Sequence, residues 1–509
     1  MATTSINEAI QDLVKEEIFP TVQDLLPAED PTWRKIKPTS VGVERAGGLG
    51  RNWIIKQVYT TGLAGQVEPF DPYADDMTTS TSRYTGMSTR GLDSGYPNPI
   101  GTPLKNTLVR NVLMAGVMGN INFPLELMLN DQLNATMIKY VAANMKGWGR
   151  RLALAFINWF FAPTNGALCG IGATVSSLDG DASGGIQQFS IRSGTGRVQS
   201  MKNNMLVDIY QWNGTTTWTK LNVDSSGADV PCVIDGIDYL NKYVRIVSVD
   251  GRALASAVGD YDTDSVQNYV FARGAIKGSP ASYTGTVPVL KGPMGYHDWV
   301  KAAASSTYIL DPTATGDDTR GIDLGKYPEF ASSVNTSTGT LTEQTLNLKI
   351  GEFYEAFGIN LDTIVTTLGV TEKYAEQPLL DGGRQVYDRT GQVLKFTGGR
   401  ASVGYALEGD SFDWVISRYI STGTMLIAKL NGGNIKLYVP PRLQGTGSRS
   451  EFDYAVQFVA PVLGYNGVFA PVRSDDQIQR SVQAPMEMLG QVVPDIPNAI
   501  EFTGVTEAS

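Results

Sequence analysis

The sequence predicts an α+β fold in which one long helix accompanies several groups of short strands. Apolar residues recur with helical spacing over residues 131–161, which indicates an amphipathic helix. Residues 173–290 instead show short alternating runs, which indicate strands. A polar tract over 66–103 separates two strand-like segments and contains almost no aliphatic side chains. With 509 residues, 42% of them hydrophobic, the chain is long enough for two to four domains.

The composition argues against several classes of protein. The 41 Lys and Arg residues against 51 Asp and Glu give a net charge of −10, with no basic run, so tight phosphate binding to nucleic acid is not expected. The only cysteines, Cys169 and Cys232, form no CxxC pair, which argues against a disulfide-stapled secreted scaffold. The N-terminal sequence MATTSINEAIQDLVKEEIF lacks the features of a signal peptide, and no apolar run reaches membrane-spanning length.

Residues 1–46 are predicted to form an N-terminal arm. Apolar residues spaced mostly three and four apart indicate an amphipathic helix over 5–26, with Ser5 and Glu8 as a capping box. Pro20 is expected to break or kink this helix. An arm that lies on another surface and an ordinary N-terminal helix of a globular domain are both compatible with the pattern.

Residues 47–110 are predicted to form an extended β-hairpin. A strand with a glycine-rich entry, GGLGRNWIIKQVYTTG, precedes the polar tract. Because this tract cannot supply a core of its own and is far longer than an ordinary loop, we expect it to reach a neighbouring subunit. The candidate intersubunit contacts are its aromatic and arginine side chains: Trp53, Tyr59, Phe70, Tyr73, Arg83, Tyr84, Arg90 and Tyr96.

Residues 111–172 are predicted to contain a strand followed by the long helix. KNTLVRNVLMAGVMGNINFPLELML reads as a strand pair that returns from the hairpin. A helix over 131–161 would be about 45 Å long at 1.5 Å per residue, and Pro163 would end it. Its predicted packing stripe consists of Met137, Val141, Met145, Trp148 and Leu152.

The β-rich stretch over 173–290 is predicted to be a small barrel or sandwich inserted into the main fold. Its strands alternate apolar and polar residues around turn signals such as Asn213-Gly214. Residues 291–470 alternate short helices and strands, and Asn431, Gly432 and Gly433 mark a tight turn. The last segment, 471–509, is thin in core-forming residues, so we expect it to lie on the surface.

The sequence offers little for catalysis. His297 is the only histidine, and its aromatic neighbours Tyr296 and Trp299 favour a packed, structural role. The glycine-rich stretches match neither a dinucleotide fingerprint nor a phosphate loop. Acidic residues at Asp71, Asp75 and Asp76 could take a calcium ion weakly, although a solvated turn is the favoured reading. We therefore predict no catalytic residue, no cofactor-binding residue, no metal site and no enzymatic activity.

The order of these elements resembles that of the major capsid proteins of tailed double-stranded DNA bacteriophages, which have the Hong Kong 97 type of capsid fold. The similarity rests on the arm, the polar hairpin, the strand KNTLVRNVLMAGVMGNINFPLELML, the helix NATMIKYVAANMKGWGRRLALAFINWFF and its exit NGALCGIG. In that family these correspond to the N-arm, the E-loop and the P-domain with its long spine helix. DTIVTTLGV and GGNIKLYV resemble A-domain strands, and EFDYAVQFVAPVLGYNGVFAPV is similar to the strand that returns to the P-domain.

The resemblance implies a coat protein that assembles with itself into hexamers and pentamers of an icosahedral head. Such a protein would be found in the virion shell, would assemble in the host cytoplasm, and would enclose double-stranded DNA without sequence-specific binding or contact with a membrane. Portal, scaffolding and decoration proteins would be its further partners. Two alternatives stay open from the sequence: a phage tail-tube or baseplate protein, and a secreted, β-rich carbohydrate-active enzyme.

Overall fold

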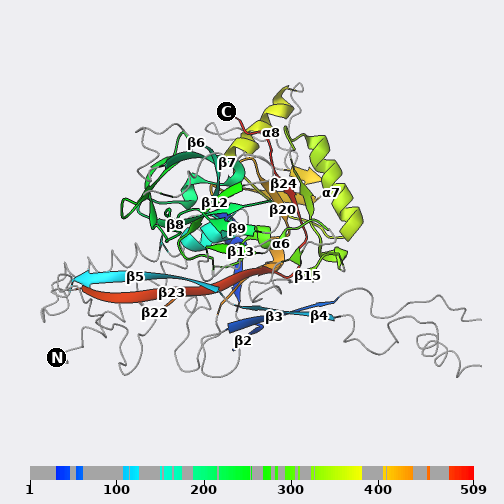
Figure 1. The fold of residues 1–509 in the computed structure, drawn as a ribbon. Helices are drawn as coiled ribbons and strands as arrows, with labels where there is room; N and C mark the ends of the chain where they lie inside the picture. Colours follow the sequence, from blue (N-terminus) through cyan, green and yellow to red (C-terminus); the bar gives the residue numbers. More distant parts are fainter. Residues whose placement is uncertain are drawn as a thin grey trace, which may run out of the picture.

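The computed structural model describes part of the chain, and its strands form five sheets (Figure 1). The described residues are 30–39, 41–45, 53–60, 107–113, 115–124, 150–151, 154–162, 166–174, 187–214, 217–252, 254, 267–276, 281–284, 293–303, 308–309, 322–325, 327–336, 338–380, 405–407, 410–439, 456–458 and 481–508.

A long antiparallel ladder forms the base of the molecule. Strand β5 (Ala115–Pro124) pairs with β23 (Ser481–Pro494) over ten residue pairs, from Ser481↔Pro124 to Gly490↔Ala115. The same five-stranded sheet contains β1 (Lys37–Thr39), β21 (Ile435–Tyr438) and β22 (Val456–Phe458). Figure 1 shows the free end of the β5–β23 ladder projecting to the left of the body.

A second ladder projects to the other side. Strands β3 (Trp53–Thr60) and β4 (Thr107–Leu113) pair antiparallel over seven positions, and β2 (Val43–Arg45) pairs with β3. The hairpin base is held by a buried apolar cluster whose members come from this sheet, from the five-stranded sheet and from the segment before residue 296: Val43, Ile55, Val112, Met294, Tyr438 and Val493. Residues 61–106, between the two strands, lie outside the described part of the chain.

The β-rich stretch forms a closed barrel. Around the barrel the hydrogen-bonded strand order is β10, β11, β7, β6, β12, β8. The barrel closes because β8 also pairs with β10. The strands of this sheet are β6 (Cys169–Thr174), β7 (Gln187–Gly196), β8 (Leu206–Trp212), β9 (Thr217–Lys220), β10 (Cys232–Asp238), β11 (Tyr243–Ser248), β12 (Gln267–Ala272) and β13 (Ser282–Thr284). Of the two predicted architectures, barrel or sandwich, the strand pairing is that of a barrel.

The barrel is filled because alternate strand residues point inward. Val207, Ile209, Ile234, Val244 and Ile246 are at most 1% exposed and form one core. In β11 the apolar positions of the sequence are the inward ones, whereas β8 and β12 bury residues on both faces, since Tyr210, Tyr269 and Phe271 belong to a second buried cluster.

A six-stranded sheet carries two helices. Its strands, in spatial order, are β16 (Ser333–Asn335), β24 (Ala499–Phe502), β20 (Met425–Ala428), β17 (Thr363–Thr366), β19 (Asp410–Ile416) and β18 (Tyr405–Leu407). The accompanying helices are α7 (Glu343–Phe357) and α8 (Leu368–Leu380). A separate pair consists of β14 (Tyr308–Ile309) and β15 (Ile322–Asp323).

Local sequence explains the limits of α7. The Thr342 side chain accepts a hydrogen bond from the Thr345 N–H at 3.1 Å, which caps the first turn. Gly358 ends the helix in the left-handed conformation at φ 64°, where glycine carries no steric penalty. Leu346, Ile350 and Phe353, spaced four and three apart, bury the inner face of the helix.

The short helices are mostly 3₁₀ turns that connect these sheets. They are η2 (Pro31–Arg34), η7 (Val198–Ser200), η9 (Pro328–Phe330) and η10 (Asn431–Gly433), with one short α-helix, α6 (Tyr296–Trp299). The predicted tight turn at residues 431–433 is thus a 3₁₀ turn. Of the predicted helix over 131–161, residues 150, 151 and 154–160 are described and are helical. Its predicted stripe lies outside the described residues: Met137, Val141, Met145, Trp148 and Leu152.

The prediction that residues 471–509 form a surface segment is wrong. Strand β24 is buried along its whole length and lies between β16 and β20, while Val492 and Val493 of β23 are at most 1% exposed. The sequence pattern indicates β23 only weakly, because Pro485 interrupts its apolar residues and proline ordinarily argues against a strand inside a sheet.

Two further strand assignments are corrected. GGNIKLYV contributes β21, which lies in the five-stranded sheet and not in the six-stranded sheet that contains DTIVTTLGV. Within the predicted closing strand at 451–472, residues 456–458 form β22, and the long partner of β5 is β23 instead. The sequence between β20 and β21 reads as one hairpin, because a turn signal at 431–433 cannot show that its two flanks belong to different sheets.

The five-stranded and six-stranded sheets are joined at two neighbouring places where the chain passes from one sheet to the other. The chain crosses between β20 and β21, and again between β23 and β24, and these strands are paired on both sides of the joint. Asn434 ties the crossings together: its side chain donates to the carbonyls of Lys429 and Ile496 at 3.0 and 3.2 Å and accepts from the Ile496 N–H at 2.9 Å. The Asn434 carbonyl also accepts from the Asp495 N–H at 2.8 Å.

Candidate functional site

Residues 30–39 are fastened to the body by polar and aromatic contacts. Asp30 is fully buried and accepts hydrogen bonds from the Ser417 hydroxyl and from the Thr32 N–H, the latter at 2.8 Å. Burial raises the pKa of this carboxyl, and the hydrogen bonds to it act in the opposite direction. Trp33 packs edge-on against Phe160, with ring centroids 5.5 Å apart. This stretch is therefore an integral part of the fold.

His297 lies in a packed environment. Its ring lies against that of Tyr296, with centroids 4.0 Å apart, and its Nδ1 is 3.2 Å from Oε1 of Glu501 on β24. Burial lowers the pKa of His297 to about 3 and raises that of Glu501 to about 7. Both shifts favour the uncharged forms, and the ring contact with Tyr296 agrees with the packed role expected for His297.

The two cysteines are free thiols in the barrel. Cys169 and Cys232 are both buried, and desolvation raises the pKa of each to about 12. A buried thiol with a raised pKa is a poor nucleophile. Within the described ranges, no group of His, Cys, Asp and Glu side chains has the arrangement of a metal site. No helix there is long and apolar enough to cross a lipid bilayer.

A buried ion pair network lies in the barrel wall. The Lys220 ammonium is 3.2 Å from the Asp208 carboxylate and 2.6 Å from that of Asp229. Asn222 donates to Asp208 at 3.3 Å and to the Val230 carbonyl at 3.0 Å, and the Gly274 N–H donates to Asp208 at 2.9 Å. The side chains of Lys220 and Asp208 are 4% and 2% exposed. These contacts satisfy the buried charges and hold β8 and β9 together.

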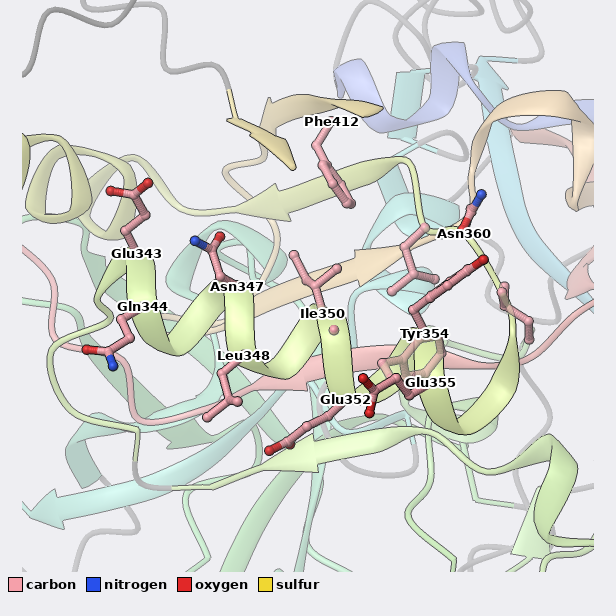
Figure 2. Close-up of a pocket in the computed structure, with 14 residues that line it drawn as sticks. Glu343, Gln344, Asn347, Leu348, Ile350, Glu352, Tyr354, Glu355, Asn360 and Phe412 are labelled. Carbon is pink, nitrogen blue, oxygen red and sulfur yellow. The ribbon is translucent and has the colours of Figure 1, made fainter. Parts of the chain in front are cut away.

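A groove of about 960 Å³ runs along α7 (Figure 2). Its floor includes Ile350, Leu361 and Phe412, and the described residues that line it include three glutamates and no lysine or arginine. We call this feature the α7 groove; its lining is Glu343, Gln344, Asn347, Leu348, Ile350, Gly351, Glu352, Phe353, Tyr354, Glu355, Ile359, Asn360, Leu361 and Phe412. Leu348 and Tyr354 are more than half exposed, so part of an apolar face lies open. Sequence reasoning missed this groove, because it is built by segments far apart in the chain.

The turn between β10 and β11 presents a second exposed apolar feature. Leu240 is 92% exposed and Tyr239 is 56% exposed, beside Asn241 and Lys242. The Asp238 carboxylate accepts hydrogen bonds from the N–H groups of Leu240 and Asn241 at 2.9 and 3.0 Å. We call residues 239–242 the barrel tip.

Two of the eight predicted intersubunit contacts fall in the described residues. Trp53 and Tyr59 belong to β3, whose backbone is paired with β4. The other six lie outside the described residues: Phe70, Tyr73, Arg83, Tyr84, Arg90 and Tyr96. The acidic cluster considered for calcium, Asp71, Asp75 and Asp76, also lies outside them.

Comparison with known proteins gives no match by sequence: no family model and no curated protein matches the chain. Solved structures do match. The cyanophage A-1(L) capsid asymmetric unit is 9% identical, with 94% of this chain and 93% of that chain covered and a TM-score of 0.37. The capsid of a native GTA particle is 8% identical, with 93% and 90% covered and a TM-score of 0.33.

A further similar structure is the holo-SrpI encapsulin complex from Synechococcus elongatus PCC 7942, at 9% identity and a TM-score of 0.20. That match covers 34% of this chain, which spans about half, 53%, of the encapsulin chain. The similar solved structures thus include the capsids of a cyanophage and of a GTA particle.

Proposed function

We propose that this chain is a structural shell protein, the major capsid protein of a tailed double-stranded DNA bacteriophage. The observation that carries the proposal is the pair of ladders that project from the body in opposite directions (Figure 1). A long two-stranded ribbon is marginally stable in water by itself, so projecting ladders are most useful where a neighbour covers them. Ladders on opposite sides suit a head-to-tail arrangement of copies, as in a ring.

The proposal assigns roles to the parts of the chain. The β3–β4 hairpin is the base of the E-loop, and the β5–β23 ladder with the helix that ends near Phe160 is the P-domain. The six-stranded sheet with α7 and α8 is the A-domain, and the barrel is the insertion domain. Copies form hexamers and pentamers of an icosahedral shell in the host cytoplasm. That shell encloses double-stranded DNA and takes portal, scaffolding and decoration proteins as further partners.

A structural role agrees with the chemistry of the described residues. The single histidine is held neutral in a packed pair and both thiols are buried with raised pKa values. A shell protein acts through repeated interfaces, each of roughly 1,000–2,000 Å², and needs no reacting group. The net charge of −10 is consistent with a wall that lies beside DNA without gripping it.

Electron microscopy of the purified recombinant protein tests the proposal directly. We expect closed shells, or hexamers and pentamers that light scattering identifies after size-exclusion chromatography. Tubes would favour a tail protein, and a monomer that persists across protein and salt concentrations would refute assembly altogether.

Removal of residues 66–103 tests the proposed E-loop. Because this polar tract lies beyond the paired strands β3 and β4, we expect the shortened protein to stay soluble and to keep its thermal unfolding transition. It should no longer form shells. Shells of normal size from the shortened protein would contradict the role given to this segment.

A further inference from the structure

The α7 groove has the properties of a docking surface. Its lining includes two exposed apolar side chains, Leu348 and Tyr354, which are 57% and 54% exposed and lie six residues apart on the helix. Between them Gly351 leaves open space, since a Cβ added there would meet no atom within 4 Å. An apolar face of this kind, rimmed by charge, is typical of an interaction site. The groove is large enough for several side chains of a partner.

The charges on the rim select the kind of partner. Glu343, Glu352 and Glu355 line the groove, and Lys349 forms an ion pair with Glu352 at 2.7 Å. The rim as a whole keeps an excess of negative charge. A partner that inserts apolar side chains next to a cation would therefore complement both the floor and the rim.

The barrel tip of the same chain carries that combination. Leu240 and Tyr239 are exposed apolar side chains, and Lys242 follows two residues later in the turn. The turn is already ordered, because Asp238 holds the N–H groups of Leu240 and Asn241 and also accepts from the Asn241 side chain at 2.7 Å. An ordered tip loses little conformational entropy on binding.

The barrel and α7 lie on opposite sides of the body (Figure 1). The β5–β23 ladder projects on the side of the barrel, whereas the β3–β4 hairpin lies on the side of α7. A contact between two different surfaces on opposite flanks is heterologous, and repeated contacts of this kind close into a ring when the rotation permits.

We propose that the barrel tip of one copy docks in the α7 groove of the next copy around a ring. Leu240 lies against Leu348, and the Lys242 ammonium pairs with Glu355, which lies two turns after Leu348 on the same face of α7. This interface rests on the proposed shell function and adds a contact between the barrel and the A-domain of neighbouring copies.

Paired cysteines test the contact in the full-length protein. The variant Leu240→Cys/Leu348→Cys should form intermolecular disulfides on mild oxidation of assembled material. Non-reducing electrophoresis should then show a ladder that extends beyond the dimer, because each copy has both halves of the contact. The native Cys169 and Cys232 are buried and should not react. Neither single variant should form the ladder.

A matched control uses another exposed barrel residue. Val249 is 56% exposed and lies at the other end of β11, so Val249→Cys/Leu348→Cys should give no ladder. A ladder as strong as that of the first pair would mean random collision. Dimers alone from Leu240→Cys would indicate a symmetric tip-to-tip contact. Either outcome would overturn the proposed contact.

Charge exchange provides an independent test. Lys242→Glu and Glu355→Lys, each alone, should reduce the yield of rings or shells at least several-fold at low salt. The double variant should restore most of the yield, which a change in folding alone would not do. Equal yields from all four proteins, together with no cysteine ladder, would refute the contact while leaving the shell function intact. Failure of the unaltered protein to assemble would instead refute the shell function.

Discussion

The buried ion pair of the barrel permits a stability prediction with a worked magnitude. Replacing Lys220 by Met removes the ammonium 3.2 Å from the Asp208 carboxylate, at a site where the Asp208 side chain is 2% exposed. At the observed 3.2 Å, two unit charges attract by about 5 kcal/mol for an effective dielectric constant of ~20. Asp208 keeps its hydrogen bonds from Asn222 and Gly274, so we expect the loss to be about 3 kcal/mol, at the lower end of what breaking a buried pair costs.

Hydrogen exchange of the barrel amides measures this loss locally. In Lys220→Met, the amides of β8 and β9 should exchange about 100-fold faster than in the wild type, since 1.4 kcal/mol is a factor of ten. The double variant Lys220→Met/Asp208→Asn removes the unpaired charge and should recover most of the protection. Amides of the six-stranded sheet serve as the internal control. Unchanged exchange in the single variant would refute the view that the pair stabilises the barrel.

Three further predictions concern the other sheets. Glu501→Gln should change the pH dependence of stability. Because burial raises the pKa of Glu501 from 4.5 to about 7, the contribution of its protonated form to the free energy of unfolding is complete below pH 4.5 and is lost as the pH rises to 7. Thermal unfolding should show the wild type losing up to about 3 kcal/mol relative to the variant over that range. Phe160→Ala removes a side chain that is 1% exposed and touches Trp33, and it should cost about 3–5 kcal/mol in denaturant titration, whereas an effect below 1 kcal/mol would contradict its burial. Asn434→Ala removes the tie between the two strand crossings and leaves the Ile496 N–H without its partner, so amides near residue 496 should exchange faster by a factor that corresponds to about 1–3 kcal/mol, with β8 amides unchanged.

Local patterns predicted the elements that depend on local physics. Residues 291–470, expected to alternate short helices and strands, contain α7, whose inner face is buried. Alternation around Asn213-Gly214 corresponds to the hairpin of β8 and β9. In these segments the residue pattern and the nearest neighbours in sequence determine the structure.

The pairing of strands that are distant in the sequence could not be predicted from local patterns. Nothing in the sequence of residues 481–494 indicates that they pair with residues 115–124, more than 350 positions earlier, and Pro485 argues against a strand there. The closure of the barrel through β8 and β10 depends on strand order, which no single segment contains. The α7 groove also requires Phe412 to be brought beside the helix, so its lining could not be assembled from the sequence alone.

The double crossing at Asn434 has a mechanical consequence. A single strand between two sheets would act as a swivel, since rotation about its own axis leaves both sheets intact. Two crossing segments that are hydrogen-bonded to each other resist such twisting, because rotation would break the bonds between Asn434 in one segment and Asp495 and Ile496 in the other. Bending across the pair remains the softest motion. Tension applied along β23 therefore passes to the six-stranded sheet through two backbone segments at once. The joint permits rotation about one axis only.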